Sequence, residues 1–119
     1  MEAITAKLKE YLAMDHELEF GEFNAYYNEV IKELNDHYSE YDGDALLTMR
    51  YVLSTMAVNA QAWSMRKDKN SKKYKKINDK CRFWFDAIGY KLEKELGYTK
   101  EQIEAGEEKA DAEMRPQED

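Results

Sequence analysis

Two histidines are the side chains in this chain best suited to bind a transition metal. His37 has Glu33 and Glu40 nearby, but no second nitrogen ligand lies three or four residues away on the same helical face. His16 lies in the segment HELEF, which lacks the second histidine of a zinc-protease motif. We therefore expect His37 to be a partly buried structural residue and His16 a surface residue, with no metal site and no cofactor.

Cys81 is the only cysteine, and it could act as a nucleophile only if solvent reached it. It lies on an apolar row between Ile77 and Trp84, which predicts a buried thiol. The triplet Asp42-Gly43-Asp44 lacks the further acidic positions of a calcium loop, so it predicts a turn that ends one helix and caps the next. No phosphate-binding glycine loop or nucleophile elbow is present. We do not expect an enzyme.

Positive charge is concentrated in one window, from Arg66 to Arg82. This window has nine basic and two acidic residues, whereas residues 1–65 have a net charge of −8 and residues 83–119 a net charge of −6. On a helix whose Tyr74, Ile77 and Cys81 face inward, the lysines gather on the outward face. We define the basic patch as Arg66, Lys67, Lys69, Lys72, Lys73, Lys76 and Lys80.

Negative charge runs through the segment before this window. Spaced carboxylates on a rigid helix can imitate a phosphate backbone and bind the basic groove of another protein, because complementary charge steers association. Two tyrosines near these carboxylates could anchor such a contact, since a tyrosine side chain buries a large area and keeps a polar hydroxyl at its tip. We expect this acidic face to comprise Glu29, Glu33, Asp36, Glu40, Tyr26 and Tyr38, with both tyrosines partly exposed.

Hydrophobic spacing predicts that helices position these side chains. One proline in 119 residues, Pro116, and five glycines favour long helices. The inward row of the second helix is predicted to be Phe23, Tyr27, Val30, Leu34, His37 and Tyr41. The row of the third is predicted to be Leu46, Met49, Leu53, Met56, Ala60 and Trp63. We expect four main helices over 2–14, 21–41, 45–65 and 72–96, and a short fifth over 100–110.

Length and composition indicate a single all-α domain, a compact helical bundle over residues 1–110. Thr99 and Gln102 form a capping-box pattern that opens the last helix. We expect residues 111–119 to be an acidic, frayed and disordered tail. No apolar run is long enough for a membrane span or a secretory signal, so we expect a cytoplasmic protein that does not bind a membrane.

These patterns favour a non-enzymatic acidic protein that masks the surface of a protein partner. The expected partner is a nucleic-acid-processing protein with a basic groove, and a phage- or mobile-element-encoded inhibitor of a host defence nuclease would have this character. One alternative is a module that binds nucleic acid directly through the basic patch. Another is a structural bundle that associates with itself, because the sequence does not separate a monomer from a homodimer.

Overall fold

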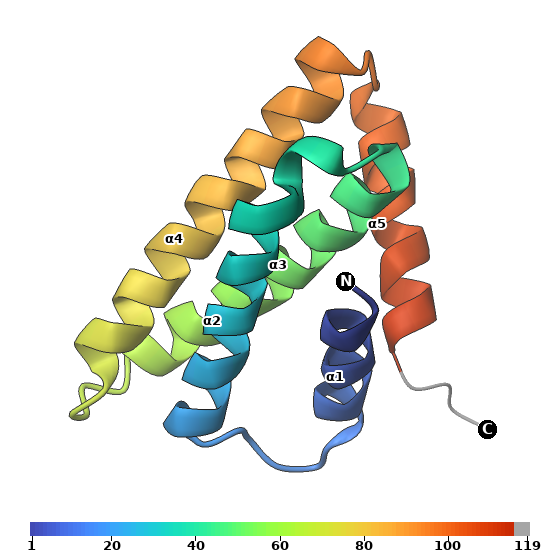
Figure 1. Ribbon diagram of the computed structural model, residues 1–119. Coiled ribbons are helices and arrows are strands. Elements are labelled where there is room, and N and C mark those ends of the chain that lie inside the picture. Colours follow the sequence, from blue (N-terminus) through green and yellow to red (C-terminus); the bar gives the residue numbers. More distant parts are fainter. Residues whose placement is uncertain (116–119) are drawn as a thin grey trace.

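A computed structural model describes residues 1–115, and every regular element in this part of the chain is helical (Figure 1). A 3₁₀ turn (Tyr38–Glu40) follows the second helix, and a π-helical turn (Lys91–Glu95) extends the fourth. The predicted all-α fold is confirmed. The five α-helices are α1 (Glu2–Ala13), α2 (Phe20–His37), α3 (Gly43–Ser64), α4 (Ser71–Tyr90) and α5 (Lys100–Met114).

Helix α3 lies at the centre of the fold, and α4 and α5 pack against it (Figure 1). Its predicted inward row is confirmed over most of its length, because every member from Leu46 to Ala60 is buried and only Trp63 is partly exposed. Ala57, a small residue outside this row, is also buried. The close approach of α4 fixes where the lysine-bearing face of α4 points.

The start of α3 differs from the sequence-based expectation, which placed it at residue 45. Within the predicted turn, Asp42 caps α3, since its side chain accepts a hydrogen bond from the Ala45 amide at 2.9 Å. Gly43 is the first residue of this helix. The glycine with a positive φ, 73°, is Gly97, which follows the π-helical turn after α4. The left-handed region suits glycine because it lacks a Cβ atom.

The inward row of α2 was predicted wrongly at two positions. Tyr26 is buried and Tyr27 is only partly buried, while His37 is exposed. The Tyr26 hydroxyl donates to the Ile4 carbonyl of α1 at 2.9 Å. A straight helix turns every 3.6 residues, so its buried face drifts away from a strict heptad row, and here it drifts toward α1.

An aromatic cluster fills the space between α2 and the α3–α4 pair. The ring of Phe23 meets Trp63 of α3 edge-on at 5.1 Å and lies 5.8 Å from the ring of Tyr74 on α4. Phe20 meets Tyr74 edge-on at 5.1 Å. These large rings join α2 to the central helices through side chains.

Arg50 ties α3 to α4 and α5. Its guanidinium lies 3.9 Å above the Phe85 ring and forms an ion pair with Glu107 of α5. A Cβ atom on Gly89 would lie 3.3 Å from Arg50 Nη2. Gly89, which has no Cβ atom, therefore allows this side chain to approach α4.

Helix α5 runs four residues beyond its predicted end, so residues 111–114 are helical rather than frayed. Ala110 and Met114 are buried, and the Tyr51 hydroxyl donates to Asp111 at 2.8 Å. These contacts hold residues 111–114 in the fold. The rest of the expected tail, residues 116–119, lies outside the described part. Within residues 1–115, no helix is both long and apolar enough to cross a membrane.

Candidate functional site

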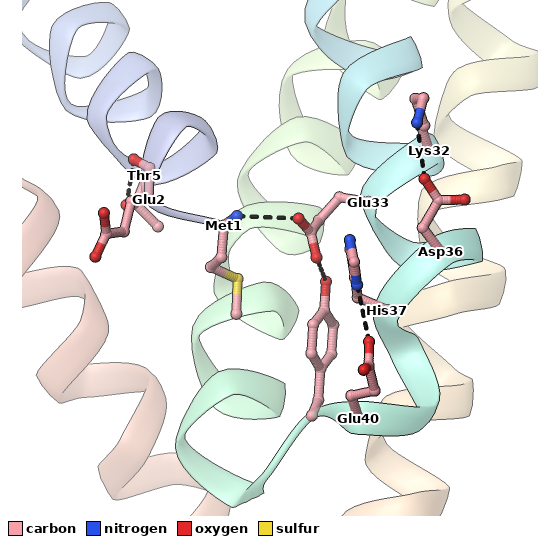
Figure 2. Close-up of polar contacts among 9 residues, drawn as sticks. Met1, Glu2, Thr5, Lys32, Glu33, Asp36, His37 and Glu40 are labelled. Carbon is pink, nitrogen blue, oxygen red and sulfur yellow. Dashed lines mark hydrogen bonds and ion pairs between the residues drawn. The ribbon is translucent and has the colours of Figure 1, made fainter.

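Glu33, in the middle of the predicted acidic face, turns inward (Figure 2). Its carboxylate accepts hydrogen bonds from the Met1 ammonium group at 3.0 Å and from the Tyr41 hydroxyl at 2.5 Å. Only 15% of the side chain is exposed. Burial alone would raise the pKa of Glu33, but these two hydrogen bonds and the ammonium charge bring the pKa below its ordinary value of 4.5. Glu33 is a structural carboxylate, and the row of outward charges is interrupted there.

We expect the contribution of Glu33 to stability to be lost in acid. A carboxylate whose pKa is lower in the folded chain stabilises the fold above its unfolded pKa, near 4.5, and loses this effect as the pH falls through the folded pKa. Glu33→Gln should therefore have a lower free energy of unfolding than the wild type at pH 7, and the gap should narrow by pH 3. Urea titrations at both pH values measure this difference in the free energy of unfolding. The exposed Glu29→Gln is the control, and an equal gap at both pH values would contradict the role of Glu33.

The other three carboxylates of the acidic face are about half exposed or more, and each contacts one basic side chain. Figure 2 shows two of these contacts on α2 and the turn that follows it. Exposed ion pairs of this kind contribute little to stability, so these carboxylates remain accessible to a partner. The hydrogen bond with Glu40 raises the pKa of His37. The pairs are Lys7–Glu29 (2.9 Å), Lys32–Asp36 (2.8 Å) and His37–Glu40 (2.8 Å).

The two tyrosines of the acidic face are less available than predicted. Tyr26 is 2% exposed, so the expectation that it is partly exposed is wrong, because α1 covers it. Tyr38 is partly buried, as expected. Its ring meets Trp84 edge-on at 5.2 Å, and Lys91 Nζ lies 4.6 Å from the ring centroid. Tyr38 holds the turn after α2 against α4.

The basic patch occupies the α3–α4 connection and the first half of α4, and all seven of its side chains are exposed. Arg66 is engaged within the fold, since its guanidinium forms a two-point ion pair with Glu17. This hydrogen bonding lowers the pKa of the Glu17 carboxyl. Among residues 1–115, the other six members form no ion pair: Lys67, Lys69, Lys72, Lys73, Lys76 and Lys80.

Phe83 adds an apolar side chain to the basic patch that the sequence analysis missed. It is 60% exposed, and Lys80 Nζ lies 5.3 Å from its ring centroid. Together with Lys76, Asp79 and Lys80 it lines a shallow, open hollow on α4. The signal was present in the sequence, because residue 83 falls outside the inward row of α4 and follows Lys76 and Lys80 at spacings of seven and three.

The candidate groups for metal or covalent chemistry remain separate. Within residues 1–115, no three side chains among His, Cys, Asp and Glu come together as a metal site. His16 is exposed beside Asp15. Cys81 is fully buried, as predicted, and this burial raises the pKa of its thiol to about 12.

No protein family model, curated protein sequence or solved structure matches this chain.

Proposed function

We propose that this chain is a non-enzymatic binding protein whose basic patch contacts the phosphates of a nucleic acid. The observation that carries the proposal is the set of six exposed lysines that form no ion pair within residues 1–115. Lysine ammonium groups that contact phosphate release the counterions condensed on the nucleic acid, which drives binding. By contrast, every carboxylate of the predicted acidic face already has a partner.

The net charge of −7 does not prevent this contact, because half of the positive charge is concentrated in the window from Arg66 to Arg82. Figure 1 shows that the end of α4 lies near the start of α5 and that the two helices diverge from there. The α3–α4 connection and the acidic helix α5 therefore lie on different sides of the fold. The fold extends 42 × 37 × 24 Å. Since the Debye length is about 8 Å at physiological salt, charges on opposite sides are largely screened from each other.

Lysine predominates over arginine in the basic patch, and this favours contact with the backbone over reading of bases. An ammonium group is a point charge, whereas arginine supplies the planar fork that pairs with guanine. We therefore expect binding that is tolerant of sequence. If all six lysines contact phosphates, log K should fall with log salt at a slope of about −5 for a duplex and about −4 for a single strand.

The deciding experiment compares two triple variants with the same change in net charge. Lys72→Glu/Lys76→Glu/Lys80→Glu reverses the α4 lysines of the basic patch, and the matched control reverses three exposed lysines elsewhere, Lys9, Lys100 and Lys109. We expect the first variant to lose at least about tenfold in oligonucleotide affinity at 0.1 M salt, with a salt slope shallower by about three. The control should bind nearly as the wild type does. Fluorescence anisotropy across salt measures both, and equal losses in the two variants would overturn the proposal.

Masking of a protein partner is the second candidate function. The accessible carboxylates of Glu29, Asp36 and Glu40 favour it, because their surface ion pairs are readily exchanged for a partner's cations. In that case Asp36→Lys would weaken capture of a basic protein partner, whereas the triple lysine variant of the basic patch would retain it.

A further inference from the structure

Phe83 lies at the end of the lysine row on α4, and more than half of its side chain is open to solvent. A single exposed apolar residue is ordinary on a protein surface. What distinguishes Phe83 is its surroundings, since Lys76 and Lys80 line the same hollow and the ammonium group of Lys80 lies 5.3 Å from the ring centroid. An accessible ring therefore lies beside two lysines that form no ion pair within residues 1–115.

The ring of Phe83 is supported from one side. It meets the indole of Trp84 edge-on, with centroids 5.8 Å apart and an interplanar angle of 81°. Trp84 is in turn held by Tyr38, at 5.2 Å. Since these neighbours restrict the ring before any ligand arrives, less conformational entropy is lost on binding.

Lysines beside an exposed aromatic ring are complementary to an unpaired nucleotide. The lysines attract the backbone, while the ring offers a flat apolar face on which any base can stack. In a duplex both faces of each base are already covered by neighbouring bases, so a stacking ring gains little there. The same surface should therefore distinguish single strands from duplexes.

We infer that the basic patch binds single-stranded nucleic acid, with Phe83 stacking on an unpaired base and Lys76 and Lys80 contacting the adjacent phosphates. This inference rests on the proposed function, because it names the class of nucleic acid that the patch accepts. Asp79 lies in the same hollow and repels phosphate, so Asp79→Asn should strengthen binding of every polyanion alike.

The test measures three ligands with each variant: a labelled oligothymidine, a duplex of equal length and heparin, which is a polyanion without bases. The variants are Phe83→Leu, which keeps an apolar side chain without a ring, and Phe83→Trp, which keeps a stacking face. We expect Phe83→Leu to lose about 5- to 150-fold in affinity for oligothymidine, corresponding to one stacked base. Its affinity for the duplex and for heparin should be unchanged, and Phe83→Trp should retain all three.

The outcomes separate the inference from the proposed function. If the wild type binds heparin and duplex as tightly as oligothymidine, or if Phe83→Leu loses nothing on oligothymidine, the inference is wrong and the proposed function stands. An equal loss of Phe83→Leu on all three ligands also overturns the inference, because a general effect on the patch would explain it. If the wild type binds none of the three at low salt, the proposed function fails and the inference with it. An unchanged urea midpoint confirms that each variant is folded.

Discussion

Phe23→Ala is expected to lower the free energy of unfolding by about 3–5 kcal/mol. The Phe23 side chain is 3% exposed, and its ring packs against Trp63 of α3 and Tyr74 of α4. Removing the ring leaves a cavity in the aromatic cluster that joins α2 to the central helices. Because domains of this size are stable by about 5–15 kcal/mol, the variant should lose a large part of its total stability.

The chain offers a matched control for this effect. Phe83→Ala removes the same atoms from a side chain that is 60% exposed, and it should change the free energy of unfolding by no more than about 0.5 kcal/mol. Urea unfolding followed by circular dichroism measures both variants. Similar losses at the two positions would mean that the aromatic cluster does not hold α2 against α3 and α4.

Hydrophobic periodicity predicted the buried face of α3 correctly, but it predicted the buried face of α2 only in part. On α3 the spacing of Leu46, Met49 and Leu53 selects the correct buried face, because α3 has helices on several sides and its row is central. On α2 the same reasoning missed Tyr26, which is covered by α1. Periodicity identifies an apolar face, but it does not say which other helix will cover the residues at its edge.

The sequence predicted the position of the basic patch better than the arrangement of the acidic face. The outward lysines of α4 share one helix, so local geometry alone places them together, as predicted. Glu33 could not be assigned in this way, because its partners Met1 and Tyr41 are 32 and 8 residues away. The end of α5 was missed for a related reason. Ala110 and Met114 pack inward among charged neighbours that made the segment resemble a tail.

Cys81 should react with a thiol reagent at pH 8 at least about 10³-fold more slowly in the folded protein than in urea. Its side chain has no exposed surface, and burial raises the pKa of the thiol to about 12, so the reactive thiolate is almost absent until the fold opens. Since Cys81 is the only cysteine, the reaction of the whole protein reports this one site. The measurement is the rate of release of a coloured thiol leaving group.

Labelling of Cys81 also tests whether the aromatic cluster and the α4 core unfold together. If the thiol becomes accessible only by global unfolding, and reclosing is fast, the labelling rate follows the unfolding equilibrium. Phe23→Ala should then accelerate labelling by about 150- to 5,000-fold, the factor equivalent to 3–5 kcal/mol. Phe83→Ala should label as the wild type does. If Phe23→Ala lowers stability in urea and leaves the labelling rate unchanged, Cys81 becomes accessible through a local opening of α4 that does not require α2 to separate.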